Sequence, residues 1–306
     1  GPLITGMDWT MALSDKQIAA IADGTKKWFD GIVERLQGDA PRLSWIKPWD
    51  GPSGAVEPRN PASGSVYTRG NSWTGLIMSD NPFWSTRPGW KKLGHPVPKG
   101  CGYDAIFWKP MMKSAEDKKT GERKTWVAGF FPYYVWNGDT VGYAAPVVEE
   151  KDETEIDAAV AEGLKMVQAY FDHPKGAKLV HGGSQAFYTR NNDTVTMPPR
   201  KQFHHDQEWL STIVHEAGHS TGHEKRLDRL TKSGFGTGEY AFEELVAELT
   251  AAEYMAQHGL TNTRTIENSE AYISNWAMKI IAMGPEKLRE AFGFATKALK
   301  VIGDPN

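Results

Sequence analysis

The sequence predicts a two-domain α+β protein, because its two halves differ in charge, in aromatic content and in histidine content. Residues 1–145 contain 10 of the 12 tryptophans and hold 18 Lys and Arg against 14 Asp and Glu, a net charge of +4. Residues 146–306 hold 17 against 24, a net charge of −7, and eight of the nine histidines follow residue 170. We expect an N-terminal domain at 11–140, a linker at 141–153 and a C-terminal domain at 154–306, with residues 1–10 as a cloning remnant and disordered start.

The composition excludes several classes of protein. A hydrophobic content of 40% and a charged content of 24% are typical of a globular protein. No apolar run approaches the ~18 residues of a membrane span, and no signal peptide is visible in the sequence. The single cysteine, Cys101, rules out an internal disulfide and a cysteine-based zinc cluster. We therefore expect a cytoplasmic protein with no membrane partner.

The first half is predicted to contain one long helix and a hairpin. Ser14 and Gln17 fit a capping box, and apolar residues then recur at helical spacing until Gly38. Residues 41–99 are rich in Pro, Gly, Ser and Asn, which predicts loops. Strands are expected at 103–109 and 125–136, with the charged segment 113–124 as the loop between them.

The second half is predicted to be mostly helical, with a small sheet. Thr154 is a candidate cap for a helix that runs through Phe171. Strands at 186–190 and 194–197 are expected to pair across an Asn-Asn-Asp turn. The remaining helices are predicted at 205–221, 239–258, 267–283 and 286–301.

The most specific motif is His-Glu-x-x-His, formed by His215, Glu216 and His219 within an apolar-periodic run. Residues four apart lie on one face of a helix, so both imidazoles can reach one cation. Glu216 can reach a water at that cation and act as general base. The alternative is a surface helix with scattered histidines. We expect one divalent ion, zinc first and manganese second.

A third ligand is required, and the segment Glu243 to Glu248 is its best source. We assign Glu244 as the ligand and Glu248, one turn further, as acceptor for the N–H of a ligating histidine. The reverse assignment is open, and Glu243 is a weaker third choice. His223 is expected to be structural, since eight helical residues separate it from His215 by about 12 Å.

Metal-activated water would attack a polarised carbonyl, which predicts a peptidase-like activity. The strand 194–197 is a candidate edge strand for pairing with an extended peptide substrate. Tyr188 and Tyr240 are candidates for stabilising the oxyanion.

The aromatic, basic first half favours binding of single-stranded nucleic acid, because bases stack on aromatic rings and cations contact phosphates. The alternative is that the tryptophans form a core. The candidate DNA-binding residues are Lys47, Trp49, Tyr67, Arg69, Asn71, Trp73, Arg87, Trp90 and Lys91.

Several segments together are typical of one protein family: the opening helix, Asn60 to Gly64, Tyr67 to Asn71, Pro98 to Gly100, Phe107 to Lys109, Met197 to Pro199, His215 to His223 and Glu243 to Glu248. With these segments the chain resembles the ArdC-type plasmid antirestriction proteins and the N-terminal part of TraC-type primases. The resemblance covers nearly the whole chain. It implies an N-terminal domain that binds single-stranded DNA non-specifically and a C-terminal zincin-like metallopeptidase domain. It also implies protection of incoming plasmid DNA from restriction during conjugation, in the recipient cell.

Two other functions remain open at this point. The chain could coat DNA with a metal site that is structural or inactive. It could also be a metallopeptidase whose aromatic domain binds protein. The peptide substrate and the oligomeric state are not predicted.

Overall fold

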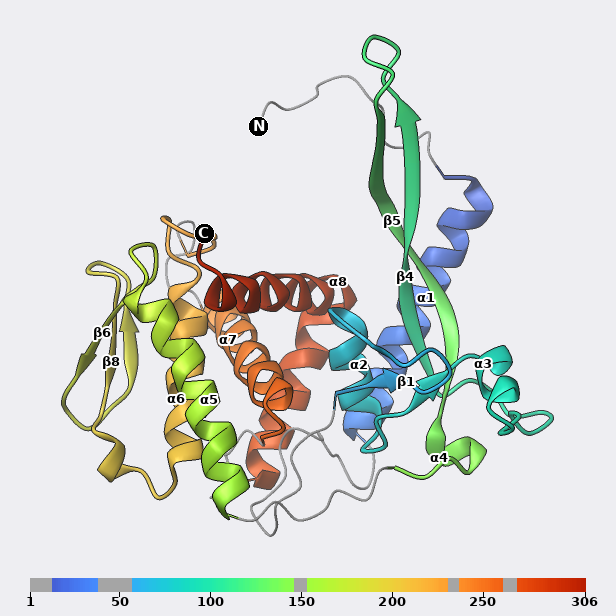
Figure 1. The fold of residues 1–306 in the computed structure, drawn as a ribbon. Helices are drawn as coiled ribbons and strands as arrows, with labels where there is room; N and C mark the ends of the chain where they lie inside the picture. Colours follow the sequence, from blue (N-terminus) through green and yellow to red (C-terminus); the bar gives the residue numbers. More distant parts are fainter. Residues whose placement is uncertain (1–12, 38–56, 146–152, 231–236, 261–268) are drawn as a thin grey trace.

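A computed structural model describes residues 13–37, 57–145, 153–230, 237–260 and 269–306. It is an α+β structure of two domains, as predicted (Figure 1). A long hairpin with a helix along its base rises from the N-terminal domain, and the C-terminal domain is a group of helices with a small sheet. Within the described segments, none of the helices has both the length and the apolar character needed to cross a membrane.

Helix α1 spans Asp15–Gln37. The predicted capping box is confirmed: the amide of Gln17 donates to Ser14 Oγ at 3.1 Å, and the amide of Ser14 donates to Gln17 Oε1 at 3.0 Å. Trp28, Ile32 and Leu36 are buried on one face. This face packs against the hairpin and against α2, where Trp28 donates its indole N–H to Thr74 Oγ1 at 3.0 Å.

The hairpin consists of β4 (Ala105–Glu116) and β5 (Arg123–Asn137). The predicted loop at 113–124 was too long, because most of its residues continue the two strands to the pair Glu116 and Arg123. The distal part of the hairpin is largely exposed on both faces, so its charged residues remain compatible with a strand. A short strand, β3 (Trp84–Ser85), pairs with the end of β5.

The segment 57–99 contains more regular structure than the predicted loops. Helix α2 (Gly70–Met78) is buried from Ser72 to Ile77. Tertiary burial therefore outweighs the weak helix propensity of its Gly, Asn, Ser and Thr residues. The other short elements are β1 (Arg59–Asn60), β2 (Ser65–Val66), α3 (Arg87–Lys92) and α4 (Gly138–Val141).

The helices of the C-terminal domain agree with the predictions to within a few residues. Thr154 lies inside the first turn of its helix and is not the cap. The last two predicted helices form α8, which bends at Gly284, where φ is 78° and a proline follows. Only the part of the predicted 267–283 helix from residue 269 onward is described. The helices are α5 (Glu153–Asp172), η2 (Arg200–Gln202), α6 (Asp206–Ser220), α7 (Thr237–Gln257) and α8 (Ser269–Gly303).

The small sheet corrects one functional expectation. Its strands are β6 (Lys178–His181), β7 (Phe187–Thr189) and β8 (Thr194–Met197). β7 and β8 pair antiparallel as predicted, but β6 pairs in parallel with the other side of β8. β8 is therefore the central strand, and the prediction that 194–197 offers a free edge to a peptide was wrong.

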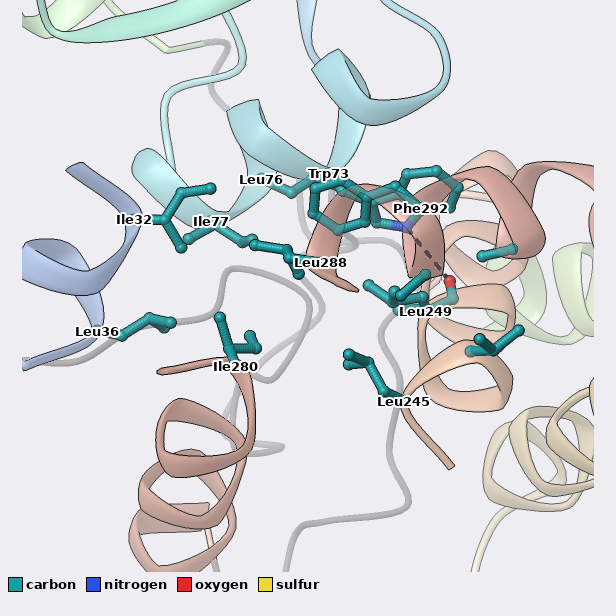
Figure 2. Packing of buried hydrophobic residues seen from close by; sticks show 14 of the residues in the cluster. Ile32, Leu36, Trp73, Leu76, Ile77, Leu245, Leu249, Ile280, Leu288 and Phe292 are labelled. Carbon is teal, nitrogen blue, oxygen red and sulfur yellow. Dashed lines mark hydrogen bonds between the residues drawn. The ribbon is translucent and has the colours of Figure 1, made fainter. Parts of the chain in front are cut away.

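One apolar core joins the two domains (Figure 2). Ile32 of α1 and Trp73 of α2 belong to the same cluster as Leu249 of α7 and Phe292 of α8. Trp73 stacks on Phe292 with ring centroids 5.3 Å apart and donates to the carbonyl of Leu249 at 3.3 Å. The N-terminal domain is thus packed directly on the helix that follows the His-Glu-x-x-His helix.

Candidate metal centre and nucleic-acid interface

The His-Glu-x-x-His motif lies on α6, which is buried along almost its whole length. Gly218, which directly precedes His219 on α6, faces α7. A Cβ at this position would lie 3.3 Å from Ala247 Cα, so glycine permits the close approach of the two helices. That approach brings the acidic residues of α7 next to the histidines of α6.

His215, His219 and Glu244 form a compact triangle of donor atoms. The two Nε2 atoms lie 3.1 Å apart. Glu244 places Oε2 3.4 Å from His215 Nε2 and Oε1 3.1 Å from His219 Nε2. Ligand atoms 2.0–2.1 Å from a tetrahedral zinc ion lie about 3.3 Å from one another. The triangle therefore fits one cation of this size.

The far nitrogens of both histidines face carboxylates of α7. His215 Nδ1 lies 3.0 Å from Glu248 Oε1, although the two groups are not aligned as a regular hydrogen bond. His219 Nδ1 lies 3.2 Å from Glu243 Oε1. A carboxylate behind a ligating imidazole fixes its tautomer and its orientation. The geometry gives Glu248 the outer position expected for it and gives Glu243 the same position behind the other histidine.

Arg229 completes this arrangement, although no local sequence motif indicates its role. It donates to Glu243 Oε2 at 2.9 Å and to Oε1 at 2.8 Å. It also donates to the carbonyl of Gly218 at 2.6 Å and to Thr221 Oγ1 at 2.8 Å. Its side chain is 4% exposed. Arg229 thus ties the end of α6 to α7 beside the histidines.

Electrostatics at the centre favour positive charge among the carboxylates. Burial lowers the pKa of His219, but its hydrogen bonds to Glu243 and Glu244 outweigh burial and raise the pKa to about 9. Burial raises the pKa of Glu244, but its hydrogen bonds to His215 and His219 outweigh burial and hold the pKa far below its ordinary value. Without a bound cation, a protonated His219 would supply the positive charge among these carboxylates.

Glu216 and Tyr240 lie at the same centre. Glu216 is 7% exposed and acts electrostatically on both His219 and Tyr240. Tyr240 is 54% exposed, one turn before Glu244 on α7, and the Glu244 carboxylate raises the pKa of its phenol. Tyr240 therefore lies where a group bound at the centre could contact it.

Tyr188 and His223 belong to a different network. Tyr188 donates its hydroxyl to Asp193 Oδ1 at 2.8 Å, and Asp193 pairs with Arg226. His223 is buried, and its Nδ1 accepts from the amide of Lys225 at 3.1 Å. The structural role expected of His223 agrees with this geometry, whereas the hydroxyl of Tyr188 is engaged away from the three donor atoms.

Two of the tryptophans predicted to contact DNA are part of the core. Trp73 is 1% exposed and Trp90 is 0% exposed. Trp90 donates its indole N–H to the carbonyl of Trp136 at 2.8 Å. A base cannot stack on a ring whose faces are covered by protein, so both residues are withdrawn as stacking candidates.

Other predicted DNA contacts divide into structural and exposed residues. Tyr67 is partly buried and donates to the carbonyl of Trp84 at 3.1 Å. Asn71 exchanges two hydrogen bonds of 2.8 Å with the backbone of Trp108. Arg69, Arg87 and Lys91 are exposed. Lys47 and Trp49 lie outside the described residues.

Comparison with known proteins identifies both domains. Residues 22–136 match the family described as the N-terminal domain of anti-restriction factor ArdC, and residues 166–291 match the family described as zincin-like metallopeptidase. The fold and these two matches therefore define a two-domain protein with an ArdC N-terminal domain and a zincin-like metallopeptidase domain.

Relatives along most of the chain agree with this class. An uncharacterized protein y4eC of Sinorhizobium fredii is 30% identical over 75% of this chain and 76% of its own length. The DNA primase TraC of Escherichia coli is 29% identical over 88% of this chain, which spans only 19% of TraC. The crystal structure of the Mn(II)-bound antirestriction protein ArdC from plasmid R388 superposes with a TM-score of 0.60, covering 91% of this chain and 96% of ArdC at 24% identity. The chain belongs to the ArdC-type proteins.

Proposed function

We propose that this chain is an antirestriction protein that binds single-stranded DNA non-specifically through its N-terminal domain and holds one divalent cation in its zincin-like domain. The observation that carries the proposal is the triangle of His215, His219 and Glu244 in a chain whose N-terminal domain matches the ArdC family. The likeness to ArdC supports our proposal that the chain protects incoming plasmid DNA during conjugation. The carboxylates Glu243 and Glu248 then orient the two histidines.

The donor set supports zinc first and manganese second. Two imidazoles and one carboxylate are the ligands of many catalytic zinc sites. A related ArdC has been crystallised with Mn(II), and the same nitrogen and oxygen donors accept that ion. Competitive loading with both metals and measurement of the retained ion would decide between them.

The same site supports a hydrolytic reaction. When bound, the cation would polarise a carbonyl and make water at the site more acidic. Glu216, adjacent in sequence to His215, is the group we assign to accept the proton of that water. Tyr240, which is exposed beside Glu244, is the candidate for donating a hydrogen bond to the substrate.

DNA binding is supported by charge and by the relatives. The first 145 residues carry a net charge of +4 in a chain whose total is −3. Among the relatives are a DNA primase and an antirestriction protein. Phosphate contacts predict that the DNA affinity falls linearly with salt on a log–log plot, whereas a flat dependence would favour a protein partner for this domain.

Plasmid transfer into restricting and non-restricting recipients tests the function. Transfer into the restricting strain is expected to rise when the wild-type chain is supplied, with no change in the non-restricting strain. Equal transfer with and without the chain would refute antirestriction. His219→Ala is expected to lose the metal, and Glu216→Gln to retain it. Protection that survives Glu216→Gln would assign the function to DNA coating alone, and protection lost in this variant would assign it to hydrolysis.

A further inference from the structure

An exposed pair of stacked tyrosines lies at the base of the hairpin. Tyr103, just before β4, and Tyr134, on β5, have ring centroids 4.6 Å apart and an interplanar angle of 18°. They are 38% and 45% exposed. Among the described residues, the other stacked aromatic pairs each contain a ring that is almost fully buried. This pair therefore offers an aromatic surface to solvent, whereas Trp73 and Trp90 do not.

The backbone that carries Tyr103 is held on both sides. Before it, the carbonyl of Cys101 accepts from Arg87 at 2.7 Å, and the carbonyl of Gly102 accepts from the indole of Trp136 at 2.7 Å. After it, the amide of Asp104 donates to the carbonyl of Val135 at 3.0 Å. A platform whose position is fixed before binding loses little conformational entropy when a ligand arrives.

The charged residues in the segment that leads to Tyr103 are cations. Residues 81–103 contain four Lys and Arg and no Asp or Glu. Asp104, which follows Tyr103, is acidic, and its carboxylate accepts hydrogen bonds from the amide of Asn137 and the hydroxyl of Thr140. Arg87 lies over the Trp136 ring at 4.6 Å, and Lys91 follows one helical turn later on α3 with its side chain exposed. Lys27 of α1 also interacts with Tyr134, but the Lys27 ammonium forms an ion pair with Asp23 at 2.9 Å. The excess of cations therefore comes from the α3 side.

We infer that Tyr103 and Tyr134 form a stacking site for a base of single-stranded DNA, with Arg87 and Lys91 of α3 as the cations for its phosphates, an assignment that rests on the proposed function. The site is expected to bind single strands and not duplexes, because the bases of a duplex cover one another's faces. An unpaired base can stack on an exposed ring while cations contact the adjacent phosphates. An aromatic surface of this kind binds any base, which matches non-specific recognition.

Fluorescence anisotropy of the full chain with a labelled oligothymidine tests the site. The double variant Tyr103→Ala/Tyr134→Ala is expected to bind about 5- to 100-fold more weakly. Tyr103→Phe/Tyr134→Phe keeps both rings and is expected to stay within about twofold of the wild type. Phe187→Ala removes a ring of 48% exposure from the C-terminal sheet and serves as the matched control. Lys91→Gln is expected to reduce the slope of log affinity against log salt by about 0.7.

A crosslinking experiment on the wild-type chain removes any dependence on the folding of variants. A bromodeoxyuridine-substituted strand is irradiated in the complex, and the attached peptide is mapped. Crosslinks at Tyr103 or Tyr134 support the site. Crosslinks confined elsewhere, or an alanine double variant with wild-type affinity, overturn the site while leaving DNA binding intact. A wild-type chain that does not bind the strand overturns the proposed function as well.

Discussion

The hydroxyl of Ser72 lies 3.1 Å from both carboxyl oxygens of Glu253, in the packed interface between α2 and α7. Glu253 is 6% exposed. Burial, strengthened by the charge of Glu57, raises the pKa of Glu253 to about 7, against a smaller lowering by the Ser72 hydrogen bond. A carboxyl group thus lies in the contact between the N-terminal domain and the helix that carries Glu244.

Glu253→Gln is expected to stabilise the protein at pH 8 and to be neutral near pH 4.5. The folded state holds the proton of Glu253 more tightly than the unfolded state, so the free energy of unfolding falls as pH rises from about 4.5 to about 7. The difference across this window is up to about 3 kcal/mol. Denaturant unfolding at pH 5 and pH 8 measures it, with the exposed Glu162→Gln as control. Equal effects of Glu253→Gln at both pH values would contradict the buried, protonated carboxyl.

Arg229→Met is expected to weaken metal binding by about 10- to 100-fold, because Glu243 would lose the partner that holds it behind His219. The variant should also lose about 2–4 kcal/mol of stability, since Glu243 would remain as a largely buried charge. Equilibrium dialysis with zinc, performed well below the melting temperature, measures the affinity of the folded chain.

Arg226→Met is the matched control for Arg229. Arg226 is also 4% exposed and also pairs with an acid, Asp193, but neither residue contacts the three donor atoms. Its loss should destabilise the fold to a similar extent and leave metal affinity unchanged. Equal losses of metal affinity in the two variants would reduce Arg229 to a general structural role.

Trp73→Phe separates the core from the DNA interface. The change removes the hydrogen bond to Leu249 and part of the ring stacked on Phe292, which should cost about 1–3 kcal/mol. The DNA affinity of the folded variant should stay within about twofold of the wild type, as measured by anisotropy at 10 °C. A variant that melts normally but binds DNA more weakly would return Trp73 to the interface.

Local signals in the sequence predicted much of the fold and the centre of the site. The capping box at Ser14 and the spacing of His215 and His219 depend on neighbours within one or two turns, so they can be read from a single segment. The sequence indicated that the acids of α7 lie near the histidines, but it did not indicate which acid is the ligand. The choice among Glu243, Glu244 and Glu248 depends on the rotation of α7 against α6, which the close contact at Gly218 determines.

Features set by distant contacts were not predictable. Helix α2 forms from residues of weak helix propensity because Trp73 and Ile77 are buried against three other helices. Arg229 lies in the turn after α6 and contacts the candidate metal centre from there. A turn has no hydrophobic periodicity, so the sequence pattern does not indicate this contact. Trp73 and Trp90 were predicted to lie on the surface because the first half is basic, but a large ring gains most free energy when it is buried. The exposed stacked pair in this domain is instead formed by Tyr103 and Tyr134.

Two glycines of α1 give a last test of how this helix packs on the hairpin. Alanine is favoured over glycine inside a helix by about 1 kcal/mol. At Gly24, however, a Cβ would lie 2.5 Å from Cγ and 2.6 Å from Cβ of Pro132, a ring that cannot move aside. At Gly31 the nearest atom is the flexible Met78 Cε at 3.8 Å, an ordinary contact. Gly24→Ala should therefore lower stability by about 1–3 kcal/mol, and Gly31→Ala should raise it by up to about 1 kcal/mol. Urea unfolding of both variants measures these changes, and a Gly24→Ala chain as stable as Gly31→Ala would mean that α1 does not rest on Pro132.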